Sequence, residues 1–162
     1  MSSNVQGAAA TVEVVVFDVG PRRLAVASAC VKELVRAVAV TALPAAPVGV
    51  DGVIDWRGAI IPVFDLRPRL GLEREDVRAS EHFLVCDVRR IGPAAVRTDR
   101  VHEILPIGDF LPLPANSSTN DLADSLFRLS DAVIVLCDLA RVLESPEIDQ
   151  LARAIRDLEG HA

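Results

Sequence analysis

The sequence is poor in aromatic residues, in lysine and in long apolar runs. Only 4% of its 162 residues are aromatic, with no tyrosine and one tryptophan, Trp56, so aliphatic side chains must fill the interior. Lys32 is the only lysine and the formal net charge is −6, which argues against a nucleic-acid-binding surface. No apolar run approaches the ~20 residues that span a bilayer, and residues 1–11 lack the features of a signal peptide. We therefore expect a cytoplasmic protein without membrane insertion, disordered at 1–11 and 160–162.

Cysteine is also scarce. The three cysteines, Cys30, Cys86 and Cys137, form no Cys-x-x-Cys pair and leave an odd count. Cys86 and Cys137 lie within apolar runs, where a thiol behaves as a small hydrophobic side chain. The pattern predicts buried free thiols in a reducing compartment, and no spacing indicates a metal or redox centre.

The sequence carries no recognisable catalytic apparatus. It has no glycine-rich phosphate loop, no Gly-x-Ser-x-Gly and no His-Glu-x-x-His. His102 and Glu103 would point to opposite faces of a strand, which makes them a poor catalytic pair. Aspartates that end or punctuate apolar strands mark the point where a strand leaves the core; they are Asp18, Asp65, Asp87 and Asp138. We predict no catalytic residue, no metal and no cofactor.

Short apolar segments separated by Gly, Pro and charged turns predict a strand-rich fold. The β-branched segment 12–19 is the first strand, and Gly20-Pro21 turns the chain into its partner at 24–27. Residues 28–38 predict a short helical turn that runs into a strand. The further expected strands are 48–54, 59–65, 82–88, 94–98, 101–107, 126–129 and 133–139, with a polar loop at 108–124.

Two later segments interrupt this pattern. The charged run 73–81 predicts a solvated linker and the best internal boundary. Ser145-Pro146 has the N-cap and first-turn residues of a helix, and its apolar stripe needs a surface to dock on, the β core by default. Short strands with one late helix and no regular βα alternation favour small antiparallel barrels over a doubly wound sheet.

Two features stand out as surface determinants. Trp56 and Arg57 occupy a tight turn between two apolar strands, in which Gly58 can adopt a positive φ. Aromatic and arginine side chains are enriched where interfaces derive most of their energy. The alternative is that Trp56 folds back on the core and Arg57 is merely solvated. At 31–34, Glu33 interrupts an aliphatic row, and the alternative there is an ordinary amphipathic surface.

The ordered series of these segments resembles the CheW-like domain family. Gly52–Gly58, followed by Ile-Ile-Pro-Val and Asp65-Leu-Arg67, is similar to the family's central signature G-V-x-N-L-R-G, an aliphatic-Pro-aliphatic strand and D-L-R. Upstream, VVVFDVG and Val31-Lys-Glu33 resemble the same family in the right order, as does Asp99–Ile104 downstream. The likeness covers about residues 12 to 158.

This resemblance implies a fold and a role. CheW-like domains consist of two five-stranded SH3-like barrels around a shared core, finished by a C-terminal helix. It implies one domain over 12–158, with a first lobe at about 20–80, a second at about 81–143 completed by the N-terminal strand, and a helix at 146–158. Such proteins are non-catalytic adaptors that join the cytoplasmic tip of methyl-accepting chemoreceptors to the regulatory domain of a CheA-type histidine kinase.

The resemblance also implies contact residues. The receptor-facing arginine of the family falls on Arg57, and Val31 and Glu33 match first-lobe positions that we assign to the kinase. The receptor-binding set is therefore Gly52, Val53, Asp55, Trp56, Arg57 and Gly58. The chain departs from the family at Asp55, where Asn is usual, at Trp56, where Leu is usual, and at Ala95, where Gly is usual.

Two rival functions stay open at this stage. One is a kinase-binding regulatory module of a divergent chemosensory system, controlling gliding, pili or gene expression, that makes no direct receptor contact. The other is a small metal-dependent enzyme that uses the strand-end carboxylates Asp65 or Asp138.

Overall fold

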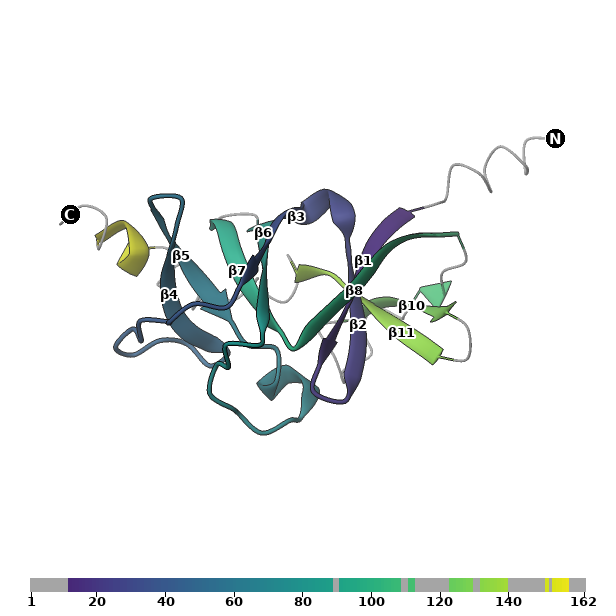
Figure 1. Ribbon diagram of the computed structural model, residues 1–162, viewed down its shortest axis with the longest axis horizontal. Coiled ribbons are helices and arrows are strands. Elements are labelled where there is room, and N and C mark those ends of the chain that lie inside the picture. Colours follow the sequence, from purple (N-terminus) through teal and green to yellow (C-terminus); the bar gives the residue numbers. More distant parts are fainter. Residues whose placement is uncertain are drawn as a thin grey trace.

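The computed structural model describes residues 12–88, 91–108, 111–112, 123–129, 132–139, 151 and 153–157. Within these residues the chain is mainly β, with its strands in two sheets that lie side by side (Figure 1). The expected ends at 1–11 and 160–162 lie outside the described residues, as does most of the expected helix at 146–158. Among the residues described, no helix is long and apolar enough to cross a bilayer.

Sheet A has six strands in the order β8-β1-β2-β11-β10-β9. Neighbouring strands are antiparallel except β11 and β2, which are parallel. The predicted turn at Gly20-Pro21 joins β1 to β2. The strands of sheet A are β1 (Val12–Val19), β2 (Arg22–Ala27), β8 (Arg100–Ile107), β9 (Leu111–Pro112), β10 (Ala123–Leu129) and β11 (Ala132–Cys137).

Sheet B has five strands in the order β3-β6-β7-β5-β4. Here β5 and β7 are the parallel pair. The 3₁₀ turn η1 (Ser28–Cys30) leads directly into β3, as predicted, and η2 (Pro68–Leu70) follows β5. The strands are β3 (Val31–Arg36), β4 (Val50–Trp56), β5 (Ala59–Phe64), β6 (His82–Val88) and β7 (Gly92–Thr98).

The two edges of sheet B meet at Thr41 and Val53. The backbone N–H of each donates to the carbonyl of the other at 2.9 Å, which joins the chain after β3 to β4. This bridge curls the sheet towards a closed barrel. Gly52 makes it possible, because a Cβ there would lie 2.1 Å from the Thr41 carbonyl oxygen and the φ angle of Gly52 is +149°.

Strands buried on both faces explain the unbroken apolar runs in the sequence. On β1, Val14 and Val16 point into the core of sheet A, whereas Val15 and Phe17 point into a core shared with sheet B. On β6 the same alternation directs Phe83 and Val85 into sheet B and Leu84 and Cys86 into the shared core. Each lobe thus has its own interior, and a third apolar cluster holds the lobes together, as the resemblance implied.

The C-terminal helix docks on this shared core. Residues 153–157 are helical, and Leu151 and Ile155 are buried members of the shared cluster. The predicted stripe therefore packs against the chain's own β core at these two positions. Its N-cap, Ser145, lies outside the described residues.

The two sheets do not coincide with the two predicted lobes. The lobe boundary at about residue 80 separates β3 from β6 and β7, but these strands are neighbours in sheet B. Likewise β2, placed in the first lobe, pairs with β1 and β11 of sheet A. Local turn signals cannot reveal such pairings, because they join distant segments. The expected loop at 108–124 also contains β9 and the start of β10.

The segment 73–81 is largely exposed, as its charges predict, but two of its residues pack against sheet B. Val77 packs against the core of sheet B, and Glu81 is 2% exposed. The Glu81 carboxylate accepts two hydrogen bonds from Arg97 on β7, each 3.0 Å long. A buried ion pair therefore fixes the end of this segment to sheet B.

Candidate functional site

The β4–β5 turn is a two-residue hairpin loop with Arg57 at its tip. Trp56 pairs with Ala59 across the ladder, and the φ angles of Arg57 and Gly58 are +54° and +84°. Two positive φ angles are the requirement of a type I′ turn. The Gly58 N–H donates to the Asp55 carboxylate at 2.9 Å. The predicted positive φ at Gly58 is confirmed.

Arginine is an energetically unfavourable residue at this position of the turn, because its φ angle is positive. A side chain in the left-handed region costs about 1–2 kcal/mol, and Asn or Gly is the usual residue there. Arg57 therefore does not serve the stability of the turn. Its side chain is 69% exposed, so the strained backbone presents a guanidinium to solvent at the end of a hairpin.

Glu33 holds the turn in place from the other edge of sheet B. Its Oε1 lies 2.8 Å from Arg57 Nη2 and accepts a hydrogen bond from Trp56 Nε1 at 3.1 Å. The Arg57 guanidinium also lies over the Trp56 ring, 5.1 Å from its centroid. Sequence reasoning assigned Glu33 and Arg57 to different partners, and the fold brings them into contact.

The strength of this cluster is moderate. An exposed ion pair contributes about 0–1 kcal/mol, and an exposed cation–π contact about 0.5–1 kcal/mol. Together they offset the strain at Arg57 without fixing its side chain rigidly. Trp56 is half-buried and packs on the core of sheet B, so it supports the turn from beneath. The guanidinium is therefore oriented and still accessible to a partner.

The other predicted contact residues lie close by but differ in exposure. Asp55 and Gly58 are exposed on the turn, whereas Gly52 and Val53 are buried where β4 meets Thr41. Val31 is half-buried and packs against the shared core. Gly52 and Val53 thus support the turn, and the accessible part of the predicted receptor-binding set is 55–58.

A buried charge network supports the same sheet, and sequence reasoning missed it. Arg97 is 1% exposed, and its Nη1 lies 2.7 Å from Asp51 Oδ2 and 3.3 Å from Asp65 Oδ2. Burial alone would lower the pKa of Arg97, but its bonds to Glu81 and Asp51 outweigh this effect and raise it. In sequence Arg97 shows only as one charged residue within an apolar strand.

The second buried arginine connects the two sheets. Arg67 is 1% exposed and donates from Nη2 to Asp99 Oδ1 at 2.6 Å. The other oxygen of Asp99 accepts the N–H of Gly20, in the β1–β2 turn. The chain from Arg67 through Asp99 to Gly20 therefore fixes sheet A against sheet B.

This network gives Asp65 a structural role. Asp65 is 2% exposed, and its carboxylate accepts the backbone N–H of Arg67 at 3.0 Å and a bond from Arg97. The Arg67 guanidinium also lies 3.6 Å from Asp65 Oδ1, so two buried arginines surround the carboxylate that the enzyme hypothesis needs. Within the described part of the chain, no three His, Cys, Asp or Glu side chains gather as metal ligands.

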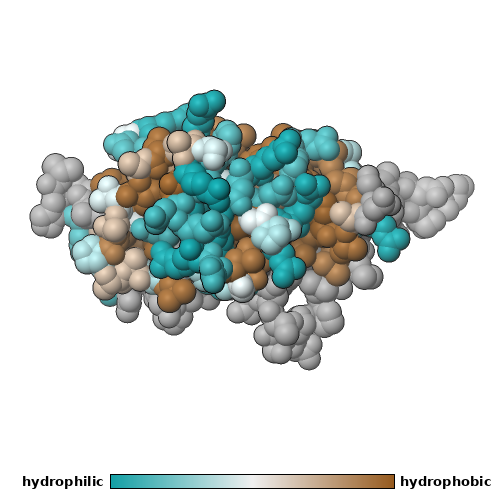
Figure 2. Space-filling model, turned by 60° about the horizontal axis from the view of Figure 1, so that its bottom comes forward, coloured by the Kyte–Doolittle hydropathy of each residue, from teal (hydrophilic) through white to brown (hydrophobic). Residues whose placement is uncertain are grey.

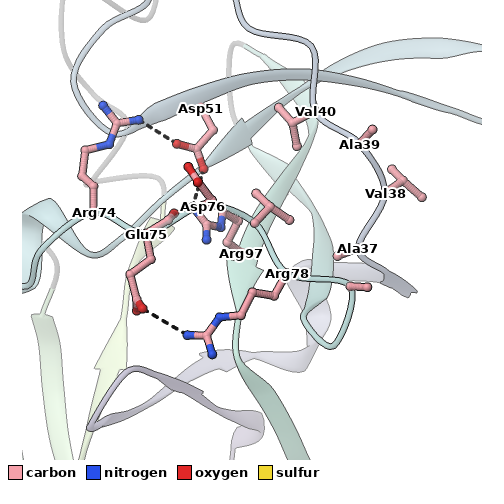
Figure 3. A pocket seen from close by; sticks show the side chains of 12 residues that line it. Ala37, Val38, Ala39, Val40, Asp51, Arg74, Glu75, Asp76, Arg78 and Arg97 are labelled. Atoms are coloured by element: carbon pink, nitrogen blue, oxygen red, sulfur yellow. Dashed lines mark hydrogen bonds and ion pairs between the residues drawn. The ribbon is translucent and has the colours of Figure 1, made fainter.

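A groove of about 540 Å³ lies beside Asp51 and Arg97, between the segments 37–40 and 74–79 (Figure 3). Four of its charged side chains form two ion pairs: Arg74 with Asp51 at 2.9 Å, and Arg78 with Glu75 at 3.2 Å. One face of the molecule carries polar side chains along its middle, between apolar areas (Figure 2).

Comparisons with known proteins agree with one another. Residues 13–147 match the family model described as CheW-like domain. A probable chemotaxis protein CheW of Rhizobium etli is 30% identical over 139 residues, 83% of this chain and 89% of the relative. The chemotaxis protein CheW of Helicobacter pylori is 27% identical over 132 residues, 79% of each chain. The crystal structure of the scaffolding protein TtCheW from Thermoanaerobacter tengcongensis aligns with a TM-score of 0.74 and 25% identity, covering 84% of this chain and 94% of that one.

Proposed function

We propose that this chain, which belongs to the CheW-like domain family, is a non-catalytic coupling scaffold of a bacterial chemosensory array. In this role it joins the cytoplasmic tip of a methyl-accepting chemoreceptor to the regulatory domain of a CheA-type histidine kinase. The family match over 13–147 and the likeness to a solved scaffolding protein support this role. The protein then works in the cytoplasm, beside the inner ends of the receptors.

The observation that carries the proposal is the Glu33–Trp56–Arg57 cluster. A guanidinium on a short, strained hairpin is a preoriented fork for carboxylates or for the carbonyls at a helix end. Glu33 favours one orientation of the guanidinium, with an Nη2–Oε1 distance of 2.8 Å. Preorientation lowers the ordering cost of binding. We assign the receptor contact to Arg57 with its neighbours 55–58.

We assign the kinase contact to the start of β3, at Val31 and Glu33. This strand forms an edge of sheet B, and Leu34 beside Glu33 is 46% exposed. An edge strand with apolar and charged side chains offers a suitable surface to a second domain of similar shape. Because Glu33 contacts Arg57, the two partner surfaces adjoin.

The structure offers less support to the rival functions. Asp65 is enclosed by arginines, so the metal-dependent enzyme loses its first candidate residue. A kinase-binding module without receptor contact leaves the exposed Arg57 on its strained turn without an assigned partner. The receptor assay below separates that module from a coupling scaffold.

The test measures binding to a receptor-tip fragment and to a kinase regulatory domain separately. Arg57→Glu should weaken receptor binding roughly ten- to hundredfold, the effect of losing a charged hydrogen bond. Kinase binding should change less. Arg69→Glu, an exposed arginine on η2, is the matched charge reversal and should bind as the wild type. Unchanged receptor affinity in Arg57→Glu would refute the assignment of Arg57.

A further inference from the structure

The fold brings together two cysteines that lie far apart in the sequence. Cys30 ends η1 and directly precedes β3, whose first residue, Val31, faces Cys86 on β6. Cys86 is fully buried in the shared core, and the half-buried Cys30 packs against the same cluster. The turn η1 and strand β6 are in contact, and each of the two thiols shifts the pKa of the other. Sequence spacing indicated no redox pair, but the pairing of β3 with β6 brings these two cysteines close together.

The position of Cys30 favours a disulfide bond. A disulfide needs two Cα atoms about 4.4–6.8 Å apart with side chains that point towards each other. Cys30 is the chain neighbour of Val31, which pairs with Cys86, and both cysteines pack in the shared core, so bond formation requires no large movement of η1 or β6.

The two thiols are chemically unequal. The hydrogen bond from Cys86 lowers the pKa of Cys30, whereas the same contact and burial raise the pKa of Cys86. The Sγ of Cys30 lies 3.0 Å from the Ala27 carbonyl oxygen, and this residue is the one that solvent can reach. A more acidic, accessible thiol beside a buried one is the arrangement of an attacking and a resolving cysteine.

We propose that Cys30 and Cys86 are a redox-sensitive modification site that closes to an intramolecular disulfide when a peroxide reaches Cys30. The Cys30 thiolate attacks a peroxide oxygen, the O–O bond breaks, and a sulfenic acid and water form once the leaving oxygen takes a proton. The Cys86 sulfur then attacks the Cys30 sulfur, the S–O bond breaks and a second water leaves. In balance, two thiols and one peroxide give one disulfide and two waters, and a thiol reductant reverses the change.

The bond would tie η1 to β6 immediately before Val31 and Glu33. It would therefore restrain the start of β3 on the strand that carries Glu33. The cysteine chemistry itself does not depend on the proposed function, and its test uses the chain alone.

The third cysteine provides an internal standard. Burial raises the pKa of Cys137 to about 12 and keeps its thiol protonated. The full chain is reduced, freed of reductant, treated with hydrogen peroxide, then unfolded and alkylated for mass spectrometry. We expect one alkylated thiol, Cys137, the loss of two hydrogen atoms, and a crosslinked peptide joining Cys30 to Cys86. The melting temperature without reductant should rise by roughly 5–10 °C.

Variants distinguish this outcome from unspecific oxidation. Cys137→Ala should still form the disulfide, whereas Cys30→Ser and Cys86→Ala, checked for folding by circular dichroism, should not. Three alkylated thiols after peroxide would overturn the proposal. So would a crosslink through Cys137, a bond only between separate chains, or oxidation of Cys30 to a sulfinic acid with Cys86 still free.

Discussion

Glu33 and Arg57 lie at opposite edges of sheet B, and their side chains meet at 2.8 Å where those edges approach each other. Glu33 belongs to β3 and Arg57 follows β4. The contact joins the two surfaces that we assign to the kinase and to the receptor. It also makes the position of the exposed guanidinium depend on a residue of another strand.

Removing the Glu33 carboxylate should loosen the turn. Glu33→Ala deletes both the ion pair with Arg57 and the acceptor for Trp56 Nε1, so we expect a loss of about 1 kcal/mol in unfolding free energy. Because Trp56 is the only tryptophan, its fluorescence reports this site alone. Its emission should shift to longer wavelength in Glu33→Ala and remain near the wild type in Glu33→Gln, which keeps an acceptor. An unchanged spectrum in Glu33→Ala would disprove the contact.

Gly52 should tolerate no side chain. Gly52→Ala places a Cβ 2.1 Å from the Thr41 carbonyl oxygen, so the Thr41–Val53 bridge must break. We expect a loss of more than about 3 kcal/mol in urea unfolding. Gly71→Ala is the matched control, because Gly71 also has a positive φ, +72°, but its Cβ would meet nothing within 4 Å. It should cost about 1 kcal/mol; equal losses would contradict the steric explanation.

Arg97 should be the most sensitive charged residue of the core. Arg97→Met leaves Glu81 and Asp65 buried without their cation, and breaking a buried ion pair costs about 3–5 kcal/mol. Arg74→Met removes an exposed partner of Asp51 and should change stability by less than about 1 kcal/mol. Chemical denaturation of the two variants compares them directly. A loss below about 1 kcal/mol in Arg97→Met would show that the network does not hold the sheet.

Asp18 should contribute to the loss of stability in acid. Burial raises its pKa, but hydrogen bonds from Arg23 and His102 outweigh this effect and hold the pKa below its usual value of 3.8. A carboxyl with a lowered folded pKa stabilises above its unfolded pKa, and the contribution disappears as the pH falls through the folded value. The effect therefore lies below about pH 4. Asp18→Asn should flatten the stability curve there, as measured by urea unfolding at several pH values; a curve as steep as the wild type would contradict this assignment.

The sequence was most informative where the information is local. Alternating aliphatic residues and the Gly20-Pro21 turn predicted β1 and β2, and the apolar runs predicted most other strands within a few residues. The Asp55–Gly58 turn followed from its length and its glycine. These features depend on neighbours along the chain, which a sequence displays directly.

Contacts between distant segments were not predictable in this way. The parallel pair β2–β11 joins the two halves of sheet A, and the parallel pair β5–β7 does the same in sheet B. No turn signal in the sequence encodes either pairing. Glu81 was predicted to be solvated because its buried partner, Arg97, lies on another strand, 16 residues further along the chain. For the same reason the meetings of Glu33 with Trp56 and of Cys30 with Cys86 emerge only from strand register.

The most direct measurement of the coupling role is a three-component bridging assay. A receptor-tip fragment is fixed on beads, and the amount of kinase regulatory domain retained is measured with and without this chain. Retention should require the wild-type chain. It should fall roughly tenfold or more with Arg57→Asn, which removes the guanidinium and suits the type I′ turn. Kinase domain retained equally without the chain, or equally well with Arg57→Asn, would contradict the account.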